Sequence, residues 1–244
     1  MKKNKSQKKV STVLAERAIQ VQRGGARAAI LGVNDGLVST LCLVIGVAAA
    51  GADTGVVLTA GFAGLVAGAI SMAAGEWISV QTQVELFEGV LKDIRSELKR
   101  NRDELMGNLA HSLTKYGITK KDAQNAVEDV SSDNADLVNL YASQVIGINP
   151  DELGSPWRAA IASFALFSGG SLIPLAAWLI GLHGMSAIVV AIALTALAGL
   201  FVGGYTAQSS GKSIVYGSLR QLLIIIFSSI VTYGIGTVIG GNLG

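Results

Sequence analysis

Residues 28–50 read AAILGVNDGLVSTLCLVIGVAAA, and residues 55–79 read GVVLTAGFAGLVAGAISMAAGEWIS. Each stretch can cross a bilayer as a helix, because about 20 predominantly apolar residues span the hydrocarbon core. Each also holds one carboxylate, Asp35 in the first and Glu76 in the second. A carboxylate at membrane depth costs about 2.5 to 3.5 kcal/mol on insertion scales, so it usually faces a bundle interior and marks an ion or proton path. We therefore expect a site at these two helices.

Met72 precedes Glu76 by four residues, and residues at that spacing share one face of a helix. A thioether and a carboxylate can then converge on one point, and Asp35 adds a second carboxylate if the two helices pack together. Hard oxygen ligands with one soft sulfur suit a first-row divalent ion better than Mg²⁺ or Ca²⁺. A second interpretation stays open, in which Met72 packs against lipid or core and Glu76 reaches for the cytoplasmic interface beside Trp77.

The composition indicates a membrane protein with several spans. Of its 244 residues, 50% are hydrophobic and 15% are charged, and the mean hydropathy is +0.51. All 19 Lys and Arg lie in residues 1–27, in residues 92–121 or at Arg158, Lys212 and Arg220. Residues 51–54, 183–184 and 240–244 hold none, so the positive-inside rule predicts a cytosolic N-terminus and an external C-terminus. The membrane would be a plasma membrane in a bacterium and a vacuolar membrane in a eukaryote.

The predicted fold is all-α, a polytopic membrane protein with five transmembrane helices and a cytosolic helical domain inserted between the second and third. We divide the chain into a basic cytosolic arm (1–27), transmembrane helices 1 and 2 (28–79), the cytosolic domain (80–156) and transmembrane helices 3 to 5 (157–244). The last three spans are expected over residues 158–182, 185–205 and 219–239, with a polar cytosolic turn at 206–218. The lysines of the arm either bind anionic lipid or serve a specific contact.

The second helix is expected to continue beyond the membrane to Arg100. Its apolar residues alternate steps of three and four, as in a heptad seam, at Trp77, Val80, Val84, Phe87, Leu91, Ile94 and Leu98. Further helices are predicted over residues 102–116, 120–130 and 134–146, the second opened by Thr119 and Asp122 in a capping-box-like arrangement. The Gly-x-x-x-Gly pairs at 32/36, 64/68 and 199/203 predict faces where spanning helices approach closely.

Three motifs resemble those of the vacuolar iron transporter family: NDGLVST at 34–40, GLVAGAISMAAGEWISV at 64–80 and PWRAA at 156–160. The resemblance covers the chain from Arg27 onward. It implies five spanning helices, a homodimer with the transport path at its centre and proton-coupled export of Fe²⁺ from the cytosol. It also implies that Asp35, Met72 and Glu76 occupy the family's membrane positions for metal and protons.

In the resembled family, glutamates of the cytosolic domain bind iron. Counting forward without gaps, the corresponding positions are Ile94, Glu97, Leu105 and Asn108, so only Glu97 keeps a glutamate. We interpret the domain as a scaffold that has lost most of its metal ligands. The candidate metal residues are therefore Asp35, Met72, Glu76 and Glu97.

Other chemistries lack their motifs. The sequence has no Gly-x-x-x-x-Gly-Lys-Ser/Thr loop, Cys-x-x-Cys pair or His-Glu-x-x-His motif, and its single Cys42 allows no intrachain disulfide. We therefore expect that the protein is not an enzyme and has no catalytic residues, no bound cofactor and no nucleic-acid partner. Fe²⁺, or Mn²⁺, is the transported substrate, and the partners are protons, the bilayer and a second copy of the chain. The alternative function is a non-transporting, metal-responsive membrane scaffold that acts through its cytosolic domain.

Overall fold

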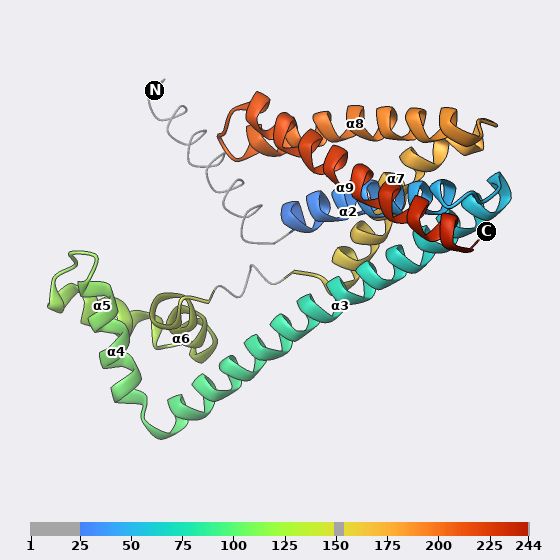
Figure 1. The fold of residues 1–244 in the computed structure, drawn as a ribbon. Helices are drawn as coiled ribbons and strands as arrows, with labels where there is room; N and C mark the ends of the chain where they lie inside the picture. The colour runs from blue at the N-terminus through green and yellow to red at the C-terminus, as the bar shows by residue number, and fades with distance from the viewer. Residues whose placement is uncertain (1–24, 149–153, 244) are drawn as a thin grey trace. The chain divides into compact units, whose positions relative to one another are not determined.

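The computed structural model describes residues 25–148 and 154–243, and every regular element within these ranges is a helix (Figure 1). The chain divides into two compact units. The membrane unit comprises residues 24–77 and 157–244, and the second unit includes residues 78–156. Residues 1–24 of the predicted basic arm fall outside the described residues.

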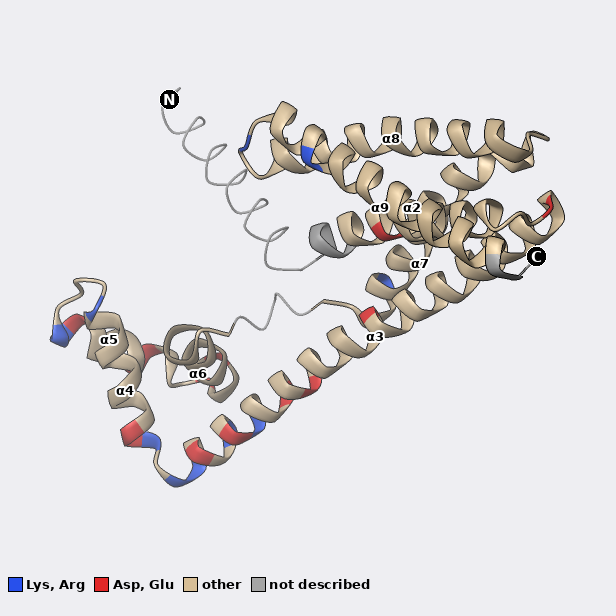
Figure 2. Cartoon of the chain, viewed as in Figure 1, with Lys and Arg blue, Asp and Glu red and all other residues tan. Residues whose placement is uncertain are grey.

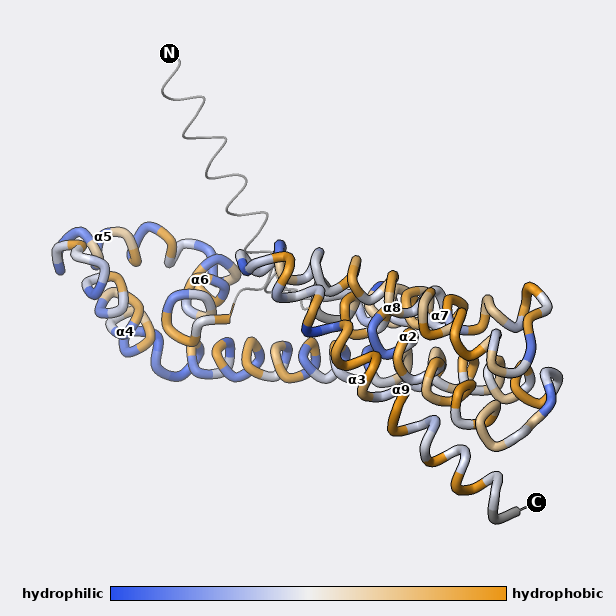
Figure 3. The backbone as a smooth tube through the Cα atoms, turned by 45° about the horizontal axis from the view of Figure 1, so that its top comes forward, coloured by the Kyte–Doolittle hydropathy of each residue, from blue (hydrophilic) through white to orange (hydrophobic). Residues whose placement is uncertain are grey.

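Five helices contribute to the membrane unit: α2 (Gly25–Ala49), the first half of α3 (Thr54–Arg100), α7 (Pro156–Leu179), α8 (Gly184–Ser209) and α9 (Ile214–Leu243). Each is long and apolar enough to cross a membrane, as predicted for five spans. Figure 3 shows hydrophobic residues dominating these helices, whereas hydrophilic residues gather on α4 to α6 and the end of α3. The all-helical class with five candidate spans is therefore confirmed.

The connection between α8 and α9 is shorter than predicted. α8 continues to Ser209 and α9 already begins at Ile214, so the expected polar turn over residues 206–218 shrinks to residues 210–213. The hydropathy pattern placed the helix ends wrongly, because polar side chains can lie inside a helix when they donate hydrogen bonds to helix carbonyls. The Thr206 hydroxyl donates to the Val202 carbonyl at 2.7 Å, and the Ser218 hydroxyl donates to the Leu200 carbonyl at 2.8 Å.

The membrane unit has one apolar core to which all five helices contribute. α9 packs against α2 and α8, and α2 also contacts α8. The most deeply buried side chains of this core are Leu41, Val44, Ile45, Val57, Leu175, Ala177, Ala187, Ala191 and Ile225. Because α2 contributes buried residues on one side only, its opposite side remains available for a site.

Glycine lets α2 approach α7 to backbone contact. A Cβ placed on Gly36 would lie 2.3 Å from the Phe167 carbonyl oxygen, and one placed on Gly170 would lie 2.5 Å from the Val33 carbonyl oxygen. Both distances are below the 3.0 Å that real Cβ contacts essentially never breach. The predicted close-packing face at Gly36 is therefore present, and α7 is its partner.

The second unit contains α4 (Arg102–Thr114), α5 (Lys120–Val130), α6 (Asn134–Tyr141) and the π-helical turn η1 (Ala142–Ile146). Thr119 caps α5 as predicted: the Asp122 amide donates to its hydroxyl oxygen at 3.3 Å. Asp133 caps α6 by accepting from the Ala135 amide at 2.6 Å. The bounds of α5 match the prediction, whereas the helix predicted over residues 134–146 changes to a π-helical turn after Tyr141.

α3 is one continuous helix of 47 residues, as the heptad seam predicted. Val80, Phe87, Ile94 and Leu98 are buried along one face of it. Ile94 and Leu98 belong to the apolar core of the second unit, together with Leu105, Leu109, Ala110, Ala123, Val127, Leu137, Val138 and Ala142. The end of the seam is therefore covered by the chain itself. Charged residues recur along this segment (Figure 2), and most of them are exposed.

Candidate functional site

Asn34, Asp35 and Gly36 face three directions around α2. Successive residues of an α-helix are turned by about 100°, so three consecutive side chains cannot share a face. Gly36 is buried against α7, Asn34 is half-buried and bonded to α9, and Asp35 is exposed. Packing on two sides of α2 thus fixes the direction of the carboxylate.

Asp35 and Met72 line the same pocket, which has a volume of about 270 Å³. α2 and α3 supply most of its wall, and α7 closes one side. The lining residues are Asp35, Ser39, Thr40, Leu43, Gly64, Gly68, Ser71, Met72 and Phe167. The pocket therefore brings together one carboxylate, one thioether and three hydroxyl groups.

Spacing by four explains how two helices build this pocket. Asp35, Ser39 and Leu43 recur every four residues on α2, and Gly64, Gly68 and Met72 do so on α3. Gly64 and Gly68 leave room for side chains of the facing helices, because a Cβ on either would meet Leu43 or the Phe167 ring at 2.4 or 2.3 Å. The predicted Gly64-x-x-x-Gly68 face thus shapes a pocket wall.

The exposure of Asp35 differs from the expected burial inside a helix bundle. In the single chain this carboxylate lies on the surface of the membrane unit, with Leu31 and Ser39 exposed one turn to either side. The apolar core lies on the other side of α2, where α2 packs against α8 and α9, so the pocket opens away from the core. A carboxylate so placed needs water, protein or a cation around it at membrane depth.

Glu76 lies one turn beyond Met72 on α3, yet it is not among the residues that line the pocket. It is half-buried, and the next residue, Trp77, packs edge-on against Trp157 with ring centroids 6.0 Å apart. Met72 and Glu76 therefore share a helix face, as their spacing predicts. The carboxylate itself sits outside the pocket that Asp35 and Met72 form.

Glu97 lies in the second unit, where its carboxylate accepts a hydrogen bond of 2.5 Å from Nδ2 of the Asn101 side chain. Of the other positions matched to family glutamates, Ile94 and Leu105 are buried in the apolar core and Asn108 is exposed. Two of these four positions thus serve packing.

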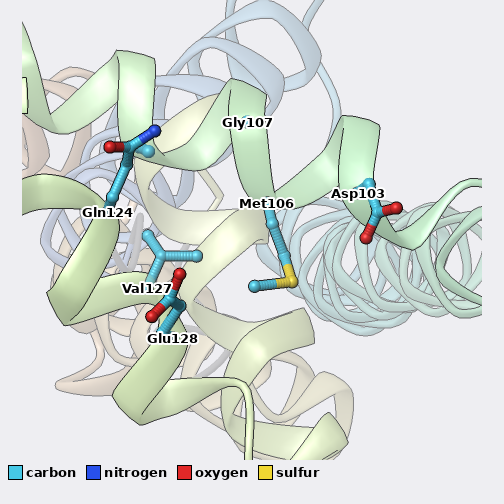
Figure 4. A pocket seen from close by; sticks show the side chains of 7 residues that line it. Asp103, Met106, Gly107, Gln124, Val127 and Glu128 are labelled. Carbon is cyan, nitrogen blue, oxygen red and sulfur yellow. The ribbon is translucent and has the colours of Figure 1, made fainter.

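A second pocket, of about 200 Å³, lies between α4 and α5 (Figure 4). It is lined by Asp103, Met106, Gly107, Ala110, Gln124, Val127 and Glu128. Sequence reasoning missed this grouping, although Asp103 and Met106 are three residues apart on α4 and Gln124 and Glu128 are four apart on α5. Among the residues that the structure describes, no three His, Cys, Asp or Glu side chains are grouped closely enough to hold a metal ion.

Comparison with known proteins assigns a family. Residues 26–237 match the VIT family. A "Vacuolar iron transporter homolog 2.1" of Arabidopsis thaliana is 34% identical over 216 residues, covering 88% of this chain and 81% of the relative. A "Vacuolar iron transporter" of Acanthamoeba castellanii is 31% identical over 212 residues, covering 83% of this chain and 77% of the relative. A "VIT-like transporter 1a" of Glycine max is 34% identical over 187 residues, covering 77% and 71%.

Proposed function

The chain belongs to the VIT family, and on that premise we propose that it exchanges Fe²⁺ for protons and exports the metal from the cytosol. The relatives compared above carry the names of transporters, and the chain is not an enzyme. Fe²⁺ is the substrate suggested by two of those names. Mn²⁺ is the alternative substrate, because the same ligands suit both ions and availability often decides between them.

One observation carries this proposal: Asp35 of α2 and Met72 of α3 line one pocket. A carboxylate can hold either a proton or a metal ion, and an exchanger needs a group that holds them in turn. The soft thioether favours a transition metal over Mg²⁺ or Ca²⁺. Glu76, one turn beyond Met72, is proposed to receive the ion on the cytosolic side of this pocket.

Transport into proteoliposomes tests the proposal. Vesicles containing the protein are given Fe²⁺ under anaerobic conditions, with the proton gradient opposed to the metal gradient. The metal should accumulate against its own concentration gradient, and a protonophore should stop the accumulation. Metal movement that ignores the protonophore would exclude proton exchange, and no movement above empty vesicles would exclude transport.

The exposure of Asp35 supports a homodimer in which two pockets face one another. A second copy packed over this side of α2 would cover the carboxylate and place two of them along one path. We expect the purified protein to have the mass of a dimer in mild detergent and in nanodiscs, as measured by light scattering. A monomer that transports at the full rate would contradict this assembly.

Residues 80–156 are proposed to form a cytosolic domain that serves as a scaffold. The burial of Ile94 and Leu105 supports this, because these residues stabilise an apolar core at positions where the resemblance places glutamates in the family. The N-terminus lies on the same side and the C-terminus on the other, in agreement with the distribution of Lys and Arg.

The scaffold role predicts that Glu97→Ala leaves transport almost unchanged. The substitution removes a carboxylate that accepts one hydrogen bond from Asn101, and a single carboxylate cannot replace the shell of ligands that a divalent ion needs. The initial rate of Fe²⁺ uptake should stay within about twofold of the unmutated rate, because Glu97 is half-buried and lies outside the apolar core, where a substitution changes stability little. A loss of more than tenfold, with the protein still folded, would make the domain a working part of the transport path.

A further inference from the structure

Gln221 of α9 reaches the turn of α2 that carries Asp35. Its Nε2 donates a hydrogen bond to Oδ1 of Asn34, a residue 187 positions away in sequence. Gln221 is only 7% exposed, and Asn34 is half-buried. A buried polar group that loses its hydrogen-bond partner destabilises the protein, because no water replaces the partner. This bond therefore opposes separation of the two side chains.

α8 holds the stem of Gln221 in place. A Cβ on Gly203 would lie 2.8 Å from the Gln221 Cβ, and a Cβ on Gly199 would lie 3.2 Å from its Cγ. The methylene groups therefore lie against two glycines of α8, and only the amide extends to α2. α8 and α9 are themselves in backbone contact nearby, since a Cβ on Gly217 would lie 2.3 Å from the Gly203 carbonyl oxygen.

The bond acts on the neighbouring carboxylate through the geometry of the helix. Asn34 can meet α9 only when Asp35 is turned about 100° away from it, toward Met72 and α3. On the other side, the Ser171 hydroxyl donates to the Gly36 carbonyl at 3.3 Å and keeps α2 against α7. Rotation of α2 about its axis would break both contacts and withdraw the carboxylate from the pocket.

We propose that Gln221 is a positioning residue for Asp35: through Asn34 it sets the rotation of α2 that presents the carboxylate to the metal pocket. The effect of Gln221 on transport rests on the proposed function, whereas its effect on the rotation of α2 does not. Gln221 does not touch the ion. It belongs to a span without any carboxylate.

Transport kinetics give the first test. Gln221→Leu should raise the KM for Fe²⁺ about fivefold, the effect of one net hydrogen bond, and leave the maximal rate nearly unchanged. Asn34→Leu should do the same, and the double variant should be no worse than either single one, because both remove the same bond. Ser229→Ala is the matched control: this buried hydroxyl of α9 donates to the Ile225 carbonyl of its own helix, so KM should not change.

A second measurement does not depend on transport. In a Cys42→Ala background, Ser39→Cys places a thiol in the pocket one turn from Asp35. Its rate of modification by a membrane-impermeant methanethiosulfonate should change when Gln221→Leu is added and stay the same with Ser229→Ala. If the unmutated protein moves no metal, the proposed function fails while this rate still reports the rotation. Unchanged modification with an unchanged KM in folded Gln221→Leu protein would overturn the inference.

Discussion

Asp35→Asn should give a protein that reaches the membrane, folds and moves no metal. The amide has the shape of the carboxylate but carries no charge and exchanges no proton, so it can neither bind the ion strongly nor return a proton. Asp35 is exposed and is not part of the apolar core of the membrane unit, so its replacement should leave stability intact. Uptake of Fe²⁺ by proteoliposomes should fall to the rate of empty vesicles.

Asp53→Asn is the control for this experiment. Asp53 is also exposed, and it accepts a hydrogen bond of 2.9 Å from the Val56 amide at the start of α3. Asn caps a helix about as well as Asp, so this variant should fold and transport like the unmutated protein. Transport by Asp35→Asn at the unmutated rate would remove Asp35 from the mechanism, and loss of transport in both variants would point to a general effect of charge.

Gly170→Ala should destabilise the membrane unit, whereas Gly169→Ala should not. A Cβ at 170 would lie 2.5 Å from the Val33 carbonyl oxygen and 3.2 Å from the Leu37 nitrogen, so α7 must move away from α2. Overpacking of this kind costs about 1 to 3 kcal/mol. A Cβ at 169 meets nothing within 4 Å, and Ala is favoured over Gly in a helix by about 1 kcal/mol.

Thermal unfolding in detergent, followed by the fraction of protein that stays monodisperse, would compare the two variants. The unfolding temperature should fall for Gly170→Ala and stay level or rise for Gly169→Ala. Because the two glycines are adjacent on one helix, a difference between them reports the contact with α2 and not the composition of α7. Equal behaviour would contradict the close approach of these helices.

The spans and the polar pocket could largely be predicted from the sequence. Long apolar stretches leave few alternatives in a bilayer, and a carboxylate inside one stands out by its cost. The same reasoning misplaced the start of α9 by five residues, from Leu219 to Ile214, because hydropathy follows side chains whereas a helix follows backbone hydrogen bonds.

Gln221 and the second pocket could not be predicted in this way. Burying an amide in an apolar span costs less free energy than burying a charge, so a single Gln does not stand out as functional. Nothing in the sequence indicates that Gln221 meets Asn34. Asp103, Met106 and Glu128 gather only because α4 and α5 pack against each other. The grouping of Glu76 with Met72 was predicted from their spacing, but Glu76 does not line the pocket, because spacing alone does not tell how far along a helix face a pocket extends.

Asn34, Asp35 and Gly36 face three different neighbours, and this arrangement limits which insertions and deletions the chain tolerates. An added or deleted codon upstream in α2 would shift the register, so that a carboxylate faced α9 or a bulky side chain met the backbone of α7. The same event at residues 210–213, between α8 and α9, would lengthen or shorten only a turn. Length variation among natural or engineered versions of this chain should therefore be absent from α2 and concentrated in such turns.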